Sequence, residues 1–365
     1  MDNSTRWYLL MLLSVCCMLF RFSNVAAAQY GSSQPTALFV FGDSLSDVGN
    51  NNYLFTIARC DFPHYGIDFP GGKPTGRCSN GKNIPDFLAD ELGVPSPKSY
   101  MSLNRTMKPG KFLEGVNFAS ASAGILNTTH KWHSSNIPLD TQIDYYSSVV
   151  GDLEESMGIV WTKCFISNSI FFISIGGNDV QVSNGTGISN FVSLLISTLK
   201  GQLEKLYNLG ARKFAFMGLE PLGCCPALRA VNKSTGDCNN EVNQISVRYN
   251  EQAAHLLQEM QSKHVDINYS FFNAYRVFTQ YINDPRTYGF NNVTVACCGM
   301  GFLRGEILCN PSASYCSNRT EYLFWDGWHQ TEAATKLLVN TAFDGSPPDV
   351  FPVNVRQLSG RLMLM

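Results

Sequence analysis

The sequence has few charged residues and no long block of either sign. Charged residues make up 15% of the 365 positions, and 27 Lys and Arg stand against 29 Asp and Glu, which gives a net charge of −2. Without a basic block the chain has no means of tracking a phosphate backbone, so we expect no nucleic-acid partner. At 44% hydrophobic residues it also lacks the composition of a disordered or fibrous protein. These properties predict a globular chain with a large buried core.

A hydrophobic run long enough to cross a membrane is also missing. The N-terminal apolar stretch at 9–20 ends at Arg21, whereas a spanning helix needs about 20 apolar residues. A basic residue precedes this stretch and three consecutive alanines follow it, which is typical of a secretory signal peptide. We therefore expect a signal peptide over 1–28, cleavage before Gln29, and a secreted mature protein that is not an integral membrane protein.

Cysteine is abundant, but the spacings that bind metals are absent. No pair of CxxC units occurs, and His130 and His133 in THKWHSS have no further ligand nearby. We therefore expect a solvated loop there, and neither a metal nor another cofactor. Ten of the twelve cysteines follow the signal stretch, and an even number in a secreted chain predicts disulfides. Cys60 with Cys78 is one short-range pair, and the other pairings stay open. The ten are Cys60, Cys78, Cys164, Cys224, Cys225, Cys238, Cys297, Cys298, Cys309 and Cys316.

Seven Asn-x-Ser/Thr sequons follow the signal stretch and predict glycosylated surface loops. They begin at Asn104, Asn127, Asn184, Asn232, Asn268, Asn292 and Asn318. Asn268 differs from the others because it falls in a predicted strand.

Four short runs of β-branched or aromatic residues are apolar on both faces, which predicts strands of a parallel sheet with helices on each side. They are ALFVF (37–41), SIFFISI (169–175), RKFAFMG (212–218) and INYSFF (267–272). A fifth, weaker strand is FLEGVNFA (112–119).

Stretches with helical periodicity lie between these strands, at 83–92, 139–157, 191–209, 241–264 and 331–343. Strands that alternate with helices predict an α/β fold, a three-layer αβα sandwich with right-handed crossovers. We expect one domain over 29–365, with the proline-rich stretch 347–355 as an extended tail laid over it.

Polar segments follow several predicted strands, at the edge of a parallel sheet where ligands collect. In FGDSLSD, a strand-to-helix turn would expose the Ser44 hydroxyl beside unpaired backbone N–H groups. The alternative is that Ser44 or Asp47 only caps the next helix, which is a common role of both residue types.

A base for such a hydroxyl is offered near the C-terminus by FWDGWHQTEAA (324–334). Asp326 lies three residues before His329, so its carboxylate can accept from the imidazole Nδ1–H and leave Nε2 as a general base. Oxyanion donors are also needed. Gly115, in EGVNFA, can offer an unobstructed backbone N–H, and Asn178, in SIGGND, can offer a side-chain amide. Turn formation is the alternative role of both residues.

Four ordered blocks together resemble the GDSL esterase/lipase family of the SGNH hydrolase superfamily, in particular its plant branch. They are FGDSLSDVGNNN, GVNFASASAG, ISIGGND and FWDGWHQTEAA. Further likeness lies at 63–93, 221–228, 296–302 and 345–358, so the resemblance runs from about Thr36 to Leu358.

The resemblance implies a flavodoxin-like sandwich of about five parallel strands and a serine ester hydrolase without a cofactor. Ser44 is then the nucleophile, with its own N–H in the oxyanion hole. Gly115 and Asn178 match the other oxyanion donors of the family. Asp326 and His329 match its closing DxxH pair, in which histidine is the base and aspartate its orienting partner.

Three positions depart from the family pattern. Gln330 stands where a proline usually follows the histidine, ASASAG replaces a more glycine-rich ASGGAG, and Cys78 replaces a residue that is commonly Phe. None of these changes removes a chemical group from the mechanism. Because proline restricts φ and glutamine does not, we expect Gln330 to loosen the loop that carries His329 and to affect rate more than reaction type.

We therefore expect a secreted, extracellular ester hydrolase of the cell wall or apoplast. Its substrates would be carboxylic esters of lipids, acylated small molecules or polysaccharides. Two other functions stay open. One is an extracellular acyltransferase, of the kind that polymerises hydroxyacyl esters in cutin, with the same triad. The other is a secreted binding or defence protein that has lost activity. Acyl and alcohol specificity and oligomeric state carry no signal in the sequence.

Overall fold

The structure is a computed structural model that describes residues 37–103, 109–130, 135–183 and 187–360. The expected signal peptide, the sequons at Asn104 and Asn184, and His133 lie outside the described residues.

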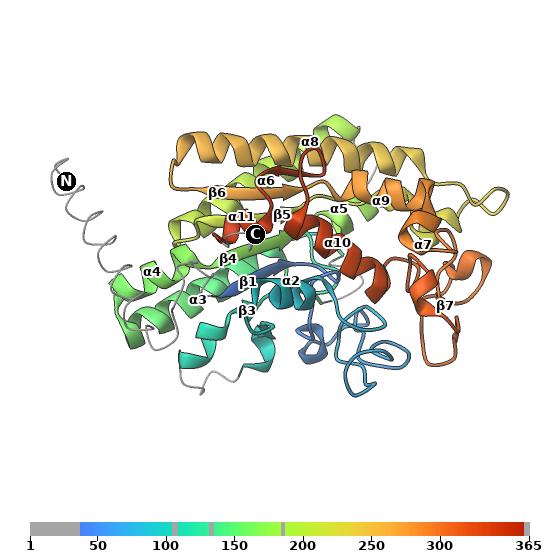
Figure 1. The fold of residues 1–365 in the computed structure, drawn as a ribbon, viewed down its shortest axis with the longest axis horizontal. Coiled ribbons are helices and arrows are strands. Elements are labelled where there is room, and N and C mark those ends of the chain that lie inside the picture. Colours follow the sequence, from blue (N-terminus) through green and yellow to red (C-terminus); the bar gives the residue numbers. More distant parts are fainter. Residues whose placement is uncertain (1–36, 104–108, 131–134, 184–186, 361–365) are drawn as a thin grey trace.

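A mostly parallel sheet of seven strands forms the centre of the molecule (Figure 1). In spatial order the strands are β2 (Lys98–Ser99), β3 (Val116–Asn117), β1 (Leu38–Gly42), β4 (Ile170–Ser174), β5 (Lys213–Met217), β6 (Asn268–Phe272) and β9 (Val350–Pro352). Every neighbouring pair is parallel except β6 and β9. The four strongest predicted strands are confirmed as β1, β4, β5 and β6, each to within one residue at either end.

The sheet has more strands than the five predicted, and two predicted segments differ from expectation. The weak strand at 112–119 is extended only at β3, because a 3-10 helix, η3 (Pro109–Glu114), occupies its first part. The stretch 347–355 is extended at β9, where it pairs with β6 as an edge strand of the sheet rather than lying over the surface. The short helix α11 (Val355–Ser359) follows it.

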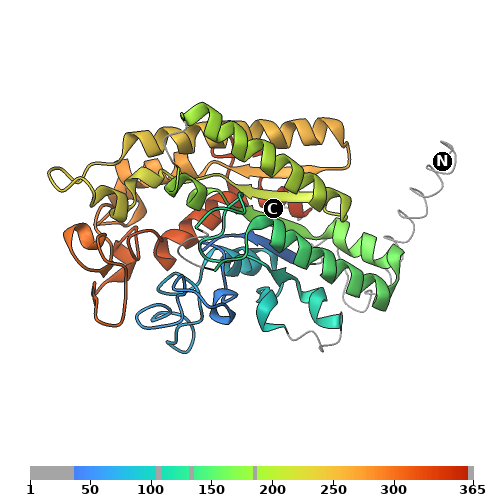
Figure 2. The ribbon, with the colours of Figure 1, turned by 180° about the vertical axis from the view of Figure 1, so that it is seen from behind.

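Helical layers cover both faces of the sheet because the inner strands are apolar on both sides. In β4, Phe171 and Ile173 belong to one hydrophobic core, and Ile170 and Phe172 belong to the other. The first core is covered by α3 (Leu139–Met157), α4 (Ile159–Asn168), α6 (Ile188–Asn208) and α8 (Asn240–Lys263). The second is covered by α2 (Ile84–Leu92), α9 (Ala274–Asn283), α10 (Glu332–Asp344) and α11. Figure 1 shows α2 and α10 in front of the strands, and Figure 2 shows the layer with α3 and α6 from the opposite side.

All five predicted helices are present, as α2, α3, α6, α8 and α10, and they complete the predicted αβα sandwich. Shorter elements lie in the connections: α5 (Gly177–Gln181), α7 (Pro226–Arg229), β7 (Cys298–Gly299), β8 (Ser314–Tyr315), η1 (Asn51–Tyr53), η2 (Tyr100–Ser102), η4 (Leu222–Cys224), η5 (Pro285–Tyr288), η6 (Phe302–Arg304) and η7 (Arg319–Glu321). Within the described ranges, no helix combines the length and apolar character needed to cross a membrane.

Disulfides cross-link the connections that follow β1, β5 and β6. Four lie among the described residues: Cys60–Cys78, Cys224–Cys238, Cys297–Cys316 and Cys298–Cys309. The predicted pairing of Cys60 with Cys78 is therefore confirmed, and Cys225 is a buried free thiol. In the part of the chain that is described, no three His, Cys, Asp or Glu side chains form a cluster that could hold a metal ion.

Most of the described sequons lie at the surface. The asparagines are exposed at 127, 232, 268 and 318 and half-buried at 292. Asn268 belongs to a strand, as predicted. It is the first residue of β6, and its side chain is exposed.

Gly115 lets β3 approach the beginning of β1. Its φ is +89°, and a Cβ there would lie 2.2 Å from the Leu38 carbonyl oxygen. Its N–H donates to the Phe112 carbonyl at 3.1 Å, which closes the η3 turn. A side chain at this position would collide with the backbone of the central strand.

We expect Gly115→Ala to lower the free energy of unfolding by ~2 kcal/mol or more, because it combines left-handed backbone strain with a backbone collision. Urea denaturation measures the change. Gly151→Ala is the matched control, since this helical glycine has nothing within 4 Å of the added Cβ and should gain ~0.5–1 kcal/mol. Equal stability of Gly115→Ala and the unmodified protein would contradict this role.

Candidate active site

The chain makes a tight turn at the carboxyl end of β1. Gly42 has a φ of +154°, and a Cβ on it would lie 2.3 Å from the Ser174 carbonyl oxygen of β4, so only glycine fits. Gln142 of α3 fixes the same residue from the other side: its Oε1 accepts the Gly42 N–H at 2.9 Å and its Nε2 donates to the Gly42 carbonyl at 2.8 Å. The start of the turn before Ser44 is therefore rigidly held.

Residues 43–47 form a single helical turn rather than the start of a long helix. The N–H groups of Ser46 and Asp47 both donate to the Asp43 carbonyl, at 3.0 and 2.9 Å. The Asp47 carboxylate then accepts the N–H groups of Gly49 and Asn50, both at 2.7 Å. Asp47 therefore does have the capping role considered from the sequence, but it caps a loop that continues into η1.

The structure brings together the three side chains predicted as a triad. His329 Nε2 lies 2.8 Å from Ser44 Oγ, and His329 Nδ1 lies 2.8 and 2.9 Å from the two carboxylate oxygens of Asp326. Asp326 Oδ1 also accepts the backbone N–H groups of Trp328 at 2.8 Å and His329 at 2.9 Å. The DxxH spacing thus places carboxylate and imidazole side by side on one turn, and the fold delivers this pair to the serine hydroxyl.

The loop that carries His329 is closed by backbone hydrogen bonds. The Trp325 N–H donates to the His329 carbonyl at 2.7 Å, and the Thr331 N–H donates to the Leu323 carbonyl at 3.0 Å. These bonds flank a bridge between Phe324 and Gln330. These bonds do not use the N–H of Gln330, so a residue that lacks this N–H, such as proline, would break none of them.

The electrostatics of the pair favour an ionised aspartate beside a basic histidine. Burial acts to raise the pKa of Asp326, but the charge of His329 and the hydrogen bonds to the carboxylate outweigh it, so this pKa is lowered. Burial acts to lower the pKa of His329, but the charge and hydrogen bond of Asp326, with a further contribution from the charge of Asp43, raise this pKa above its ordinary value. The pair is therefore arranged to stabilise an imidazolium.

Two other buried carboxyl groups lie at the same edge of the sheet. Burial raises the pKa of Asp43 to about 7, although the Leu45 N–H and the charge of His329 oppose this. Burial and the charge of Asp43 raise the pKa of Glu220 to about 8. Glu220 follows β5, is 4% exposed, and its Oε1 has no hydrogen-bond partner among the described residues. Glu220 is therefore a neutral acid at neutral pH.

Asn178 is placed where the sequence predicted. It lies in the first turn of α5, directly after β4, and is 8% exposed. Its Nδ2 donates to the Ala123 carbonyl at 2.9 Å, which uses one of its two amide protons. The second proton is left for a ligand in the turn region beyond β1 and β4.

The structure does not place Gly115 with the other predicted site residues. It lies against Leu38, the first residue of β1, whereas the turn that carries Ser44 begins at Gly42. Four residues of strand separate these points, about 13 Å at about 3.3 Å per residue. Its N–H is also used by the Phe112 carbonyl. The prediction that Gly115 donates to an oxyanion is therefore wrong.

Residues 120–123 of the same sequence block lie beside the turn that carries Ser44 instead. The Ser120 N–H donates to the Gly42 carbonyl at 3.1 Å, and the Ala123 N–H closes a turn onto the Ser120 carbonyl at 3.0 Å. Within this turn Ser122 has a φ of +66°, in the region that favours glycine. Neither the Ser122 N–H nor the Ser44 N–H has a hydrogen-bond partner in the described structure.

The asparagines that follow Ser44 in the sequence connect the 120–123 segment to the loop after Ser44 by hydrogen bonds. Asn50 Nδ2 donates to the carbonyls of Asn117 and Ala119, at 2.9 and 2.8 Å. Asn51 Nδ2 donates to the Ala121 carbonyl at 2.9 Å, and the Ala121 N–H donates back to the Asp47 carboxylate at 3.0 Å. The run DVGNNN therefore links the loop after Ser44 to residues 117–121 through hydrogen bonds. No local sequence rule predicted this role.

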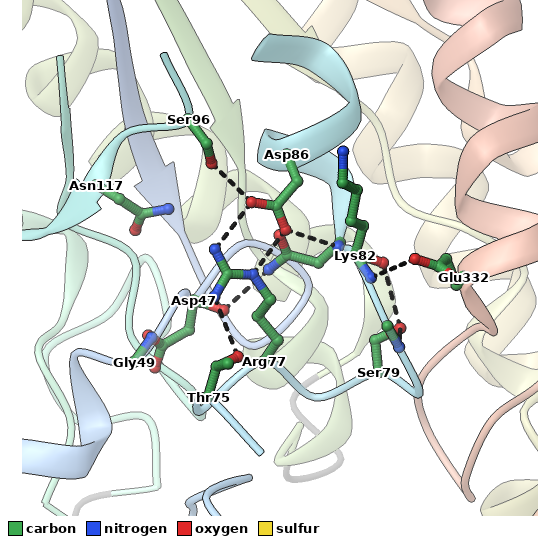
Figure 3. Close-up of polar contacts among 12 residues, drawn as sticks. Asp47, Gly49, Thr75, Arg77, Ser79, Lys82, Asp86, Ser96, Asn117 and Glu332 are labelled. Carbon is green, nitrogen blue, oxygen red and sulfur yellow. Dashed lines mark hydrogen bonds and ion pairs between the residues drawn. The ribbon is translucent and has the colours of Figure 1, made fainter. Parts of the chain in front are cut away.

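A second network connects the loop before α2 to the start of α10, just beyond His329 (Figure 3). Arg77 makes a two-pronged ion pair with Asp86 of α2, at 2.6 and 2.8 Å, and both side chains are largely buried. The Lys82 N–H donates to the Glu332 carboxylate at 2.7 Å, and the Glu332 N–H donates to Asn80 Oδ1 at 2.8 Å. Residues 77–82 and the beginning of α10 thus form one fixed unit.

Tyr65 contacts Asp326, the aspartate of the predicted triad, and was missed by the sequence analysis. Its hydroxyl donates to Asp326 Oδ2 at 2.7 Å, and the side chain is buried. It lies within the block PHYGIDFP, which contributed to the family resemblance without a role. The only sequence signal for Tyr65 was that this block resembles the family although no role had been assigned to it.

Comparisons with known proteins agree with this geometry. A family model described as GDSL-like Lipase/Acylhydrolase matches residues 38–341. Three GDSL esterase/lipases of Arabidopsis thaliana are 36%, 37% and 38% identical to this chain. The alignments cover 98%, 88% and 87% of this chain and 98%, 92% and 89% of the relatives. The chain belongs to the GDSL lipase/acylhydrolase family and is an ester hydrolase of the esterase/lipase type.

Proposed function

We propose that this ester hydrolase works by two-step acyl transfer, with Ser44 as nucleophile, His329 as general base and Asp326 as its orienting partner. The observation that carries the proposal is the continuous chain of contacts from Ser44 Oγ through the imidazole to the buried carboxylate, at 2.8 Å for each link. Nucleophile, base and orienting group within hydrogen-bond reach are the arrangement that activates a serine.

In the first step His329 Nε2 takes the hydroxyl proton while Ser44 Oγ attacks the ester carbonyl carbon. The imidazolium then gives this proton to the departing alcohol, and the acyl group remains on the serine as an ester. In the second step His329 takes a proton from water, hydroxide attacks the acyl-enzyme, and the carboxylic acid leaves as the proton returns to Ser44. Asp326 stays ionised throughout, in line with its lowered pKa.

Three groups are proposed as oxyanion donors: the backbone N–H of Ser44, the amide of Asn178, and the backbone N–H of Ser122 in place of Gly115. The two backbone donors are unpaired in the described residues and come from the turns after β1 and β3. Preorganised donors of this kind stabilise the negative charge that develops in the transition state.

The proposed setting is extracellular, with esters of lipids, acylated small molecules or polysaccharides as substrates. Four disulfides and the exposed sequons at Asn127, Asn232 and Asn318 support secretion, because disulfide formation and the glycosylation that such sequons permit both belong to the secretory route.

We expect Ser44→Ala to abolish hydrolysis of p-nitrophenyl esters and covalent labelling by a fluorophosphonate, with the fold retained by circular dichroism. Ser46→Ala is the matched control, because Ser46 Oγ is buried two residues away and makes no hydrogen bond within the described chain. It should keep both activities. Labelling that survives in Ser44→Ala would place the nucleophile elsewhere, and an unlabelled wild type would favour an inactive binding protein.

Replacing Asn178 with Ala should lower kcat by about 10²–10³-fold and change KM little, because an oxyanion donor acts on the transition state. Steady-state kinetics on a soluble ester measure the two constants separately. An effect confined to KM would show that the amide binds the ground state and the transition state equally, and it would contradict the oxyanion role.

The pH profile of kcat/KM should have an acidic limb with a midpoint above about 6.5, the ordinary pKa of histidine. The raised pKa of His329 means that the base is protonated, and the enzyme inactive, as pH falls through that value. Asp43→Asn removes a charge that contributes to this rise, so its limb should move to lower pH. An unchanged midpoint in Asp43→Asn would contradict the assigned coupling.

A further inference from the structure

We propose that Tyr65 is a positioning residue that fixes the carboxylate of Asp326, and that the loop closed by the Cys60–Cys78 disulfide holds Tyr65 in place. The inference rests on the proposed function, since it assigns Tyr65 a task within the same triad.

Tyr65 is placed to act on Asp326 through its hydroxyl. The hydroxyl lies 2.7 Å from Asp326 Oδ2, and the residue is 4% exposed. Its ring stands edge-on to those of Trp325, at 6.4 Å and 68°, and Phe62, at 5.3 Å and 77°. These neighbours fix the ring, so the hydroxyl has little freedom to leave the carboxylate.

The contact matters because Asp326 is fully buried and ionised. Its other donors, the N–H of Trp328 and the N–H and ring of His329, come from the same short turn. Tyr65 is the donor that comes from a distant segment, 261 positions away. Its hydrogen bond therefore connects the Asp326 carboxylate to a separate part of the fold, whereas the other hydrogen bonds lie within the turn itself.

The loop that carries Tyr65 is closed at several points. The Cys60–Cys78 disulfide joins its two ends, with the Cα atoms 5.1 Å apart. Directly after Tyr65, the Gly66 N–H donates to the Ser79 carbonyl at 2.9 Å. Ser79 belongs to the loop that Figure 3 shows attached through Lys82 to Glu332 at the start of α10. The residues on both sides of the triad turn are therefore held by one cross-linked loop.

A few titratable groups act on this contact. The charges of Asp326 and Asp43 act on His329, and Tyr65 and His329 face Asp326. Burial raises the pKa of the Cys225 thiol, and the charges of Glu220 and Asp326 add to this rise while that of Arg229 opposes it. When the phenol donor is lost, the carboxylate depends more on the imidazolium for its stabilisation, so the pKa of His329 should rise.

The test is Tyr65→Phe, which removes the hydroxyl and keeps the ring. We expect kcat to fall about tenfold with KM nearly unchanged, and the acidic limb of kcat/KM to move up by about 0.5 pH or more. The pKa of His329, measured by NMR titration of labelled histidine, should rise equally. Tyr146→Phe is the matched control, because its buried hydroxyl has no partner in the described chain and its loss should leave both values unchanged.

The role of the loop is tested by Cys60→Ser/Cys78→Ser with and without Tyr65→Phe. If the disulfide acts through Tyr65, its removal should raise the pKa of His329, and adding Tyr65→Phe should then raise it by less than in the intact loop. Equal increments in both backgrounds would separate the disulfide from the triad and overturn that part of the proposal.

Failure of this inference is distinguishable from failure of the proposed function. A His329 pKa that does not change in Tyr65→Phe, in an enzyme that Ser44→Ala inactivates, would overturn the positioning role and leave the triad intact. An enzyme insensitive to Ser44→Ala would overturn the proposed function itself, while the NMR titration would still report whether Tyr65 is coupled to His329.

Discussion

The hydrogen bond between Ser44 Oγ and His329 Nε2 is the interaction on which the proposed chemistry depends. It joins residues 285 positions apart, so it exists only if the end of β1 and the segment before α10 meet at one edge of the sheet. The parallel sheet makes this possible because all carboxyl ends of its parallel strands point the same way. β1 delivers the serine, β4 delivers Asn178, and the segment before α10 brings the histidine across the same edge. The loops of that edge lie together in both ribbon views (Figures 1 and 2).

Three of the buried carboxyl groups at this edge differ in pKa because their neighbouring charges and hydrogen-bond donors differ. Asp326 accepts from its own turn and from Tyr65, and its pKa is lowered despite complete burial. Asp43 accepts from the Leu45 N–H and has an intermediate pKa of about 7. Glu220 has an oxygen with no donor in the described structure, and its pKa rises to about 8. For Asp326 the charge of the adjacent imidazole and the hydrogen bonds together outweigh burial, whereas for Asp43 and Glu220 burial prevails.

Much of this arrangement was predictable from the sequence because it depends on local patterns. Apolar runs identified the four inner strands, helical periodicity identified the major helices, and the DxxH spacing placed Asp326 next to His329 on one turn. Strands β2 and β9 were missed because two or three residues at a sheet edge leave no periodic signal. The contact from Tyr65 was missed for another reason: a single hydroxyl that reaches across the fold leaves no pattern in its neighbourhood.

The error over Gly115 has a physical explanation in the direction of the strand that follows it. In a parallel sheet, groups that face the ligand edge must come after a strand, yet Gly115 comes before β3. Its need for glycine is real, but the cause is the carbonyl of Leu38 and not a substrate. The turn at 120–123 comes after the same strand, and its left-handed residue is Ser122 rather than a glycine. Gly115 is therefore the glycine that the sheet requires, whereas strand direction favours the 120–123 turn as the source of the proposed oxyanion donor.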